Sequence, residues 1–179
     1  MRFRLLCALT AVLLGLSAEG CVSQNFRDDV QIATKPAAKR NPAPDFEVKD
    51  ANGQSFRLAD YKGKVVLLNF WATWCGPCKV EIPWFIDFER NYKDRGFAVV
   101  GISLDDDGWE AVKPYLERRR MNYRVALGNM DIERLYGGGT GIESLPTSFI
   151  IDRDGRVADV HVGLISKSEY QNELEELLH

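Results

Sequence analysis

Histidine is almost absent from this chain of 179 residues, which contains only His161 and the final residue, His179. A closed zinc site needs four ligands, usually nitrogen or sulfur atoms. The pair Cys75 and Cys78 has too few other cysteines or histidines to complete such a site, so we expect no metal. Basic residues are not in excess either, because 23 Lys and Arg stand against 26 Asp and Glu. The net charge of −3 excludes the strongly basic surface of a nucleic-acid-binding protein.

The sequence also has no uncharged run long enough for a membrane-spanning helix. The uncharged run of residues 5–18 follows two arginines and is shorter than the ~20 apolar residues that a membrane-spanning helix needs. Its length is typical of a secretory signal peptide, which we assign to residues 1–20. Ala18 and Gly20 are small residues suited to cleavage before Cys21, and we predict that Cys21 carries a lipid. The charged residue between them departs from lipoprotein signals, so cleavage without lipidation and an uncleaved anchor are the alternatives.

Residues 21–44 show no apolar periodicity and end in KPAAKRNPAP, which predicts a flexible tether. One domain without internal repeats is expected over residues 45–179, and its βαβ order indicates the α/β class. The acids of residues 105–107, with Gly108, are expected to cap a helix. The expected elements are a hairpin over 45–57, strands over 64–72, 97–104, 123–127, 147–152 and 156–162, helices over about 75–95, 109–120 and 166–178, and a helical turn over 131–136.

The segment WATWCGPCKVEIP, residues 71–83, places a C-x-x-C pair where a buried strand should end and a helix should begin. A disulfide between residues this close closes a very small loop and gains little stability, which argues against a purely structural role. A helix that begins at Cys75 favours a thiolate there, exposed and able to attack a disulfide. Cys78, one turn into the helix and shielded, can then resolve the mixed disulfide. Gly76 and Pro77 suit a first helical turn, since the missing proline N–H is not needed there.

FWATWCGPC resembles the active-site segment of thioredoxins. Together with the export signal, Glu81 and the stretch LPTSFIIDRDGRV, it makes the chain from about residue 42 onward similar to membrane-tethered thioredoxin-like oxidoreductases of the TlpA/ResA type. This resemblance implies a thioredoxin fold, in which helices flank a central mixed sheet, with an added N-terminal β-hairpin and an inserted βα unit. It also implies work outside the cytoplasm.

Asn69 replaces the buried aspartate of thioredoxins and cannot exchange a proton. Glu81 lies on the apolar face of the expected helix, where burial would raise its pKa and suit it to exchange the Cys78 proton. The resemblance implies that role, and the alternative is a solvated acid that stabilises the first helical turns. Pro83 should kink the helix beyond the cysteines, or else start a second helix.

Pro146 precedes an expected strand, and an X–Pro bond is ordinarily trans. The resemblance instead implies a cis proline that faces the cysteines. We therefore expect a substrate-binding groove bordered by residues from both segments: Trp74, Gly76, Pro77, Leu145, Pro146 and Thr147. Phe70 and Trp71 are expected in the core.

These features predict a thiol-disulfide oxidoreductase of the bacterial cell envelope, with no cofactor, that reduces disulfides of exported proteins. The resemblance further implies apocytochrome c as a type of partner, a membrane protein as electron donor, and attachment through the N-terminal anchor to a periplasmic membrane surface; we expect a monomer. A peroxiredoxin-like peroxidase is a second interpretation, but Ala72 and Leu68 occupy its signature Thr or Ser and Pro positions. A non-catalytic binding module is a third.

Overall fold

A computed structural model describes residues 34–179, so the predicted signal peptide, Cys21 and the first part of the predicted tether lie outside the described residues. Three short 3-10 helices, Ala37–Lys39, Leu58–Tyr61 and Lys93–Arg95, accompany the main elements. Those elements are β1 (Glu47–Lys49), β2 (Ser55–Arg57), β3 (Val65–Trp71), α1 (Gly76–Tyr92), β4 (Phe97–Ser103), α2 (Trp109–Arg119), β5 (Arg124–Leu127), α3 (Met130–Tyr136), β6 (Thr147–Ile151), β7 (Val157–Val162) and α4 (Lys167–Leu178). Between residues 34 and 179, no helix combines the length and apolarity needed to cross a membrane.

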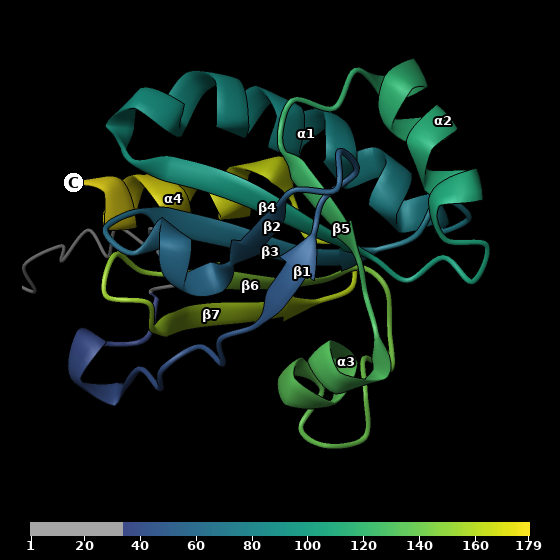
Figure 1. The fold of residues 1–179 in the computed structure, drawn as a ribbon. Coiled ribbons are helices and arrows are strands. Elements are labelled where there is room, and N and C mark those ends of the chain that lie inside the picture. Colours follow the sequence, from purple (N-terminus) through teal and green to yellow (C-terminus); the bar gives the residue numbers. More distant parts are fainter. Residues whose placement is uncertain (1–33) are drawn as a thin grey trace, which may run out of the picture. The chain divides into compact units, whose positions relative to one another are not determined.

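The central sheet has the strand order β5-β4-β3-β6-β7 (Figure 1). Strands β3, β4 and β5 are parallel, whereas β6 is antiparallel to both β3 and β7. A β3-α1-β4 crossover therefore meets a β6-β7-α4 unit at the β3–β6 pair, which confirms the predicted thioredoxin fold with a mixed sheet. Between these two units lie α2 and the β5-α3 pair, which matches the predicted inserted βα unit, and β1 and β2 form the separate N-terminal hairpin.

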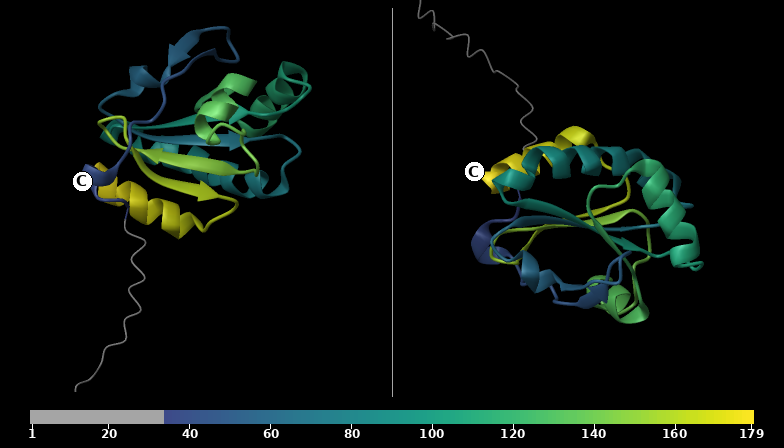
Figure 2. Two further views of the ribbon diagram at one scale, coloured as in Figure 1. Left: turned by 90° about the horizontal axis from the view of Figure 1, so that it is seen from below. Right: turned by 45° about the horizontal axis from the view of Figure 1, so that its top comes forward.

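Strand β3 lies in the middle of the sheet because its side chains can be buried on both faces. All seven residues of Val65–Trp71 are buried, as expected of the strand that precedes the cysteines. Alternate side chains point to opposite faces. Helices α1 and α4 cover one face, and the β1–β2 hairpin and α3 cover the other (Figures 1 and 2). The carboxyl end of β3 thus reaches the first turn of α1 from the middle of a closed core.

Two hydrophobic clusters, one on each face, hold these layers together. On the hairpin side, Phe46 and Phe56 pack with Phe70 of β3 and Tyr136 of α3. The cluster under α1 and α4 contains Val65, Leu67, Phe85, Phe88, Tyr170 and Leu174. Burying an aromatic or branched aliphatic side chain contributes roughly 1.5–3 kcal/mol to folding, so each cluster is a major source of stability.

Helix α1 runs without interruption through Pro83 to Tyr92. Pro83 therefore does not start a second helix, which was the alternative interpretation of the sequence. The last turn tightens into the 3-10 helix Lys93–Arg95 and stops at Gly96, whose φ of 80° lies in the left-handed region that favours glycine.

Residues 34–44 differ from the sequence expectation, which assigned them to a flexible tether. The amides of Lys35 and Ala43 donate hydrogen bonds to carbonyls beside or within β7, at 3.2 and 2.9 Å. Arg40 forms an ion pair with Asp152 at 2.9 Å, with both side chains about nine-tenths buried. Residues 34–44 are held to the rest of the domain chiefly through backbone groups and this ion pair. Contacts of this kind need no periodic apolar side chains, so the sequence shows no apolar periodicity here. The packed domain therefore includes residues 34–44.

The hairpin is expected to depend on Phe56, which is 2% exposed and contacts Phe46 and Tyr61 edge-to-face. Phe56→Ala should lower the free energy of unfolding by about 3–5 kcal/mol, because it opens a cavity between hairpin and sheet. Chemical denaturation measures this loss. Lys49→Ala, on the exposed face of the same hairpin, is the control and should change stability by less than about 0.5 kcal/mol. A similar small effect of Phe56→Ala would show that the hairpin does not pack as described.

Candidate active site

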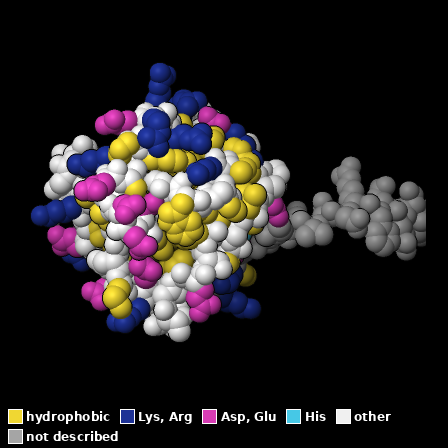
Figure 3. Space-filling model, turned by 90° about the vertical axis from the view of Figure 1, so that its right-hand side faces the viewer, with side chains coloured by type: hydrophobic (Ala, Val, Ile, Leu, Met, Phe, Trp, Pro, Cys, Tyr) yellow, Lys and Arg dark blue, Asp and Glu magenta, His cyan; other side chains and the backbone are white. Residues whose placement is uncertain are grey.

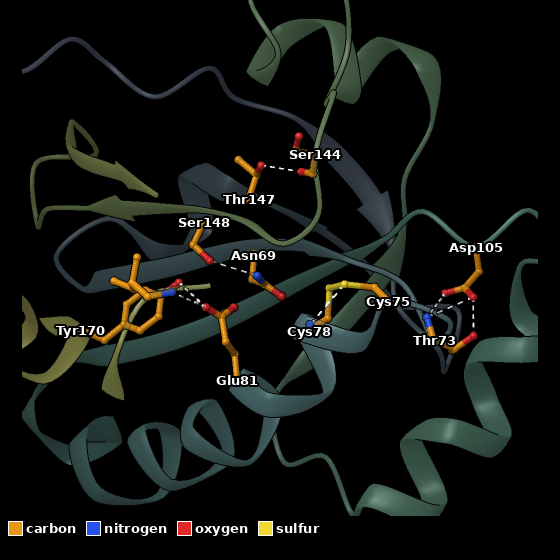
Figure 4. Close-up of a disulfide and its surroundings, with 11 residues drawn as sticks. Asn69, Thr73, Cys75, Cys78, Glu81, Asp105, Ser144, Thr147, Ser148 and Tyr170 are labelled. Atoms are coloured by element: carbon orange, nitrogen blue, oxygen red, sulfur yellow. Dashed lines mark hydrogen bonds between the residues drawn. A yellow bond between two sulfur atoms is a disulfide. The ribbon is translucent and has the colours of Figure 1, made fainter. Parts of the chain in front are cut away.

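The two cysteines lie at the junction of β3 and α1 (Figure 4). Cys75 is the N-terminal cap of α1, and its sulfur accepts a hydrogen bond from the amide of Cys78 at 3.2 Å. The two side chains form a disulfide, with an S–S distance of 1.99 Å and a Cα–Cα distance of 5.4 Å. One helical turn thus brings both sulfurs to the amino end of α1.

The amino end of α1 provides an electropositive setting for the sulfur of Cys75. The first amides of a helix have no intrahelical partner and carry the positive end of the helix dipole. Pro77 lies in the first turn, where its lack of an N–H leaves no helical hydrogen bond unmade. Once the disulfide is reduced, these amides favour negative charge on Cys75 more than on a cysteine elsewhere in the chain.

The disulfide is more enclosed than the sequence indicated. Cys75 is 4% exposed and Cys78 1%, so the expectation of an exposed Cys75 is wrong for this oxidised form. The cysteines belong to a cluster with Trp71 and Ala72, against which Leu145 packs. Exposed side chains adjoin the pair, chiefly Trp74, which is 65% exposed. A partner that reaches the sulfurs must therefore contact the surface made by Trp74, Gly76 and Pro77.

Glu81 is fully buried three residues after Cys78, on the same side of α1. Burial raises its pKa from 4.5 to about 7, against the opposing effects of the Ile165 amide, the Tyr170 hydroxyl and the charge of His161. The hydroxyl of Tyr170 donates to Oε1 at 3.2 Å, and the amide of Ile165 lies at 3.5 Å (Figure 4). Oε2 has no partner within the described residues. This carboxyl group can gain or lose a proton near neutral pH.

Behind Glu81 lies a second buried group of polar side chains, which the sequence did not reveal. The rings of Tyr170 and His161 are nearly perpendicular, with centroids 5.3 Å apart. His161 Nε2 and Glu173 Oε2 are 2.8 Å apart. Burial lowers the pKa of His161, but the hydrogen bond and charge of Glu173 more than offset this, so the pKa lies above its ordinary value. Because these residues follow Glu81 by about 80 positions or more, no local sequence signal connects them.

Asp159, His161 and Glu173 also form a group of metal-ligand type, with one atom from each lying within 4.8 Å of the others. His161 Nε2 and Glu173 already bind each other directly at 2.8 Å. Zinc binds nitrogen and oxygen ligands of this kind, so within residues 34–179 these three side chains are a group that could hold such an ion. Because His161 and Glu173 already bind each other, the group is better described as an ion pair than as a metal site.

Asn69 of β3 is buried on the same side of the sheet and is uncharged at every pH. Its amide donates to the hydroxyl of Ser148 on β6 at 3.0 Å (Figure 4). Where thioredoxins have a carboxyl group, this protein thus has an uncharged asparagine that is hydrogen-bonded to Ser148. Glu81 is the first carboxyl group that follows the cysteines on α1.

The Leu145–Pro146 peptide bond is cis, as the resemblance implied. The carbonyl of Pro146 already accepts a hydrogen bond from the amide of Gly163 at 2.7 Å. The side chain of Thr147 donates to the carbonyl of Ser144 at 2.7 Å (Figure 4). The backbone amide and carbonyl of Leu145 have no hydrogen-bond partner among residues 34–179. Of the three predicted groove residues in this segment, Leu145 therefore has the backbone groups available to a bound chain.

Asp105 has a different role from the helix cap that the sequence suggested. Gly108 caps α2 and no side chain bonds to that helix end. The carboxylate of Asp105 instead accepts from the amide of Thr73 at 2.9 Å, from the Thr73 hydroxyl at 2.5 Å and from the Ser103 hydroxyl at 2.7 Å (Figure 4). Asp105 thereby fixes the loop that leads into Cys75. Asp105 and Thr73 are 32 residues apart, so there is no local sequence signal of this contact.

Comparisons with known proteins agree with this geometry. The family model described as "AhpC/TSA family" matches residues 40–160. The chain is 36% identical over 135 residues to the thiol-disulfide oxidoreductase ResA of Bacillus thuringiensis, covering 75% of this chain and 76% of the relative. It is 31% identical over 176 residues to ResA of Geobacillus thermodenitrificans, covering 97% and 96%.

A solved structure extends the comparison to three dimensions. The thiol:disulfide interchange protein, a thioredoxin family protein from Chlorobium tepidum, superimposes with a TM-score of 0.73 at 35% identity, over 80% of this chain and all of the other. Sequence, fold and the disulfide at the amino end of α1 point to one activity. The chain belongs to the AhpC/TSA family and is a thiol-disulfide oxidoreductase of the ResA type.

Proposed function

We propose that this protein reduces disulfides in exported proteins, with Cys75 as the attacking residue, Cys78 as the resolving residue and Glu81 as the group that exchanges the Cys78 proton. The observation that carries this proposal is the position of Cys75 as the cap of α1, one turn ahead of a less exposed Cys78. Gly-Pro between the cysteines is similar to reducing thioredoxins and favours the reductase direction.

The proposed reaction has two exchange steps. The thiolate of reduced Cys75 attacks one sulfur of the substrate disulfide, so that the substrate S–S bond breaks, a mixed disulfide forms and one substrate thiolate leaves. Cys78 then attacks the Cys75 sulfur, which releases the second substrate thiolate and leaves the Cys75–Cys78 disulfide. Two electrons pass from the protein to the substrate, and each departing thiolate takes up a proton.

Glu81 supports the second step. Cys78 reacts only as a thiolate, and its surroundings are apolar, so its proton needs an acceptor close by. A carboxylate with a pKa of about 7 can accept that proton near neutral pH and later return it. Within residues 34–179 Oε2 has no hydrogen-bond partner, so one oxygen is available for this exchange.

Substrate binding is proposed at the surface between the first turn of α1 and the cis-Pro segment. Trp74, Gly76 and Pro77 are exposed beside the disulfide. Leu145 packs against the same cluster as the cysteines, and its backbone amide and carbonyl have no hydrogen-bond partner among residues 34–179. Pro146 and Thr147 fix the course of the backbone there. A substrate held through backbone groups leaves side-chain identity largely open, which suits an enzyme with several partners.

We further propose that the protein works in the bacterial cell envelope as a monomer, held to a membrane through a lipid on Cys21 and a tether. Work in an oxidising compartment requires a supply of electrons, for which a membrane protein of the thiol-disulfide relay type is the proposed donor. Apocytochrome c, whose haem-binding cysteines must be reduced, is one proposed substrate. A peroxidase activity is less favoured, since Ala72 and Leu68 stand where peroxiredoxins have their signature residues, and a peroxide-consumption assay separates the two.

Cysteine variants test the order of attack. Cys75→Ser should abolish insulin disulfide reduction, because no thiolate then remains at the helix end to attack. Cys78→Ala should instead accumulate a mixed disulfide on Cys75, since the resolving thiol is missing. Mass spectrometry of non-reduced tryptic peptides identifies the linked partner, both with purified substrate and from the native envelope. Insulin reduction retained by Cys75→Ser would contradict the assignment.

Glu81→Gln tests the proton exchange through both rate and stability. At pH 7 the variant should resolve the mixed disulfide about 10²-fold more slowly in stopped-flow measurements, because Gln cannot take a proton. Stability provides an independent measure for the oxidised protein. Between pH 4.5 and 7 the folded wild type holds a proton that the unfolded chain releases, so its free energy of unfolding falls as pH rises.

The contribution of Glu81 to that fall, about 3 kcal/mol for the shift from 4.5 to about 7, should be missing in Glu81→Gln, whose stability should therefore fall less than that of the wild type. Denaturant titrations at pH 4.5 and 8 measure it. Glu110→Gln, at an exposed position on α2, is the control and should keep the wild-type dependence. Identical pH dependence in wild type and Glu81→Gln would mean that Glu81 titrates like an exposed carboxylate.

A further inference from the structure

A surface groove of about 770 Å³ lies beside the redox site, between the first turns of α1 and the outer side of α2. Thr73, two residues before Cys75, and Lys79, directly after Cys78, line one wall. Tyr115, Arg118 and Arg119 of α2 line the other. A partner chain whose disulfide reacts at Cys75 could therefore place a neighbouring segment of the same chain in this groove.

The groove carries positive charge that no ion pair among residues 34–179 neutralises. Lys79, Arg118 and Arg119 are exposed, and within residues 34–179 none of them forms an ion pair. Glu110 is the single acidic residue among those that line the groove. The whole chain has a net charge of −3, so this local excess of positive charge runs against the overall balance.

The helix dipole explains only part of this arrangement. Arg118 and Arg119 lie in the last turn of α2, where positive charge is favourable. Lys79 lies near the amino end of α1, where positive charge is unfavourable. The dipole of α1 therefore gives no reason for a cation at that position.

The arginines are also held in place toward the groove. The guanidinium groups of Arg118 and Arg119 lie 5.9 and 5.5 Å from the ring centre of Tyr115, whose side chain is buried. Such cation–π contacts restrict flexible side chains and lower the entropy lost on binding. Figure 3 shows this face, with hydrophobic side chains in the middle, Lys and Arg gathered along the upper margin, and Asp and Glu mainly to the left and below.

We propose that the groove between α1 and α2 binds an acidic segment of the partner protein, next to the segment that carries the partner's reactive disulfide. The inference rests on the proposed exchange at Cys75 and adds a specificity element to it. Hydrophobic contact at Trp74 would bring the disulfide to the sulfur, while carboxylates of the flanking segment pair with Lys79, Arg118 and Arg119.

The test compares two synthetic peptides that contain the same internal disulfide, flanked in one by Asp and Glu and in the other by Lys. Rates of reduction by the reduced protein are measured at low and high salt. The groove variant is Arg118→Glu/Arg119→Glu, with Arg118→Gln/Arg119→Gln as a milder second variant. The control is Lys62→Glu/Lys93→Glu, which makes the same charge change at exposed positions near the opposite end of β3 and α1. Bis(2-hydroxyethyl) disulfide, a small neutral substrate, reports on the thiol chemistry alone.

Wild type and control should reduce the acidic peptide about tenfold faster than the basic one at low salt, with the preference shrinking at high salt. The Glu variant should reverse this preference, the Gln variant should abolish it, and both should reduce the neutral disulfide at the wild-type rate. Equal rates for both peptides in wild type, or an unchanged preference in the Gln variant, would overturn the groove proposal while leaving the oxidoreductase intact. No reduction of any of the three substrates by the reduced wild type would instead contradict the proposed function, and the groove proposal with it.

Discussion

The position of β3 is the constraint on which the rest of the structure depends. Every residue of this strand is buried, and it pairs with β4 on one side and β6 on the other. A strand buried on both faces cannot shift its register without exposing apolar side chains, so its carboxyl end is fixed. Cys75 caps the next helix only four residues later, and Asp105 fastens the intervening loop through Thr73. The redox pair therefore lies on a rigid support. The disulfide can be reduced and re-formed without a rearrangement of the fold.

Burial of Glu81 adds the second feature of the site, at a cost to stability. A carboxyl group without water around it prefers to be protonated, and the hydrogen bond from Tyr170 and the charge of His161 only partly oppose that preference. His161 is itself held by Glu173 of α4. Residues of α1, β7 and α4 thus act on one carboxyl group, and its pKa near 7 is a property of the assembled domain rather than of α1. A neutral Asn69–Ser148 pair beside it adds no competing charge.

The parts of this fold that follow from the sequence are those with a local physical signature. Runs of mainly apolar residues predicted β3 and β4, and helical spacing predicted α1 and α4. The C-x-x-C pair at the junction of β3 and α1 predicted the redox site. Contacts between distant segments left no such trace. The bond from Asp105 to Thr73 joins residues 32 apart, and that from Tyr170 to Glu81 joins residues 89 apart. Residues 34–44 attach through backbone groups and the Arg40–Asp152 pair, so their polar composition suggested a tether. The enclosure of Cys75 depends on packing by Trp71 and Leu145, which the sequence alone cannot place.

The central claim is that the amino end of α1 makes the sulfur of Cys75, and not that of Cys78, the reactive one. Limited alkylation of the reduced protein by iodoacetamide at pH 7, followed by peptide mapping, tests it most directly. Nearly all label should appear on Cys75 in the folded protein, whereas both cysteines should react at similar rates in urea. Equal labelling of the two cysteines in the folded protein, or faster labelling of Cys78, would contradict the claim.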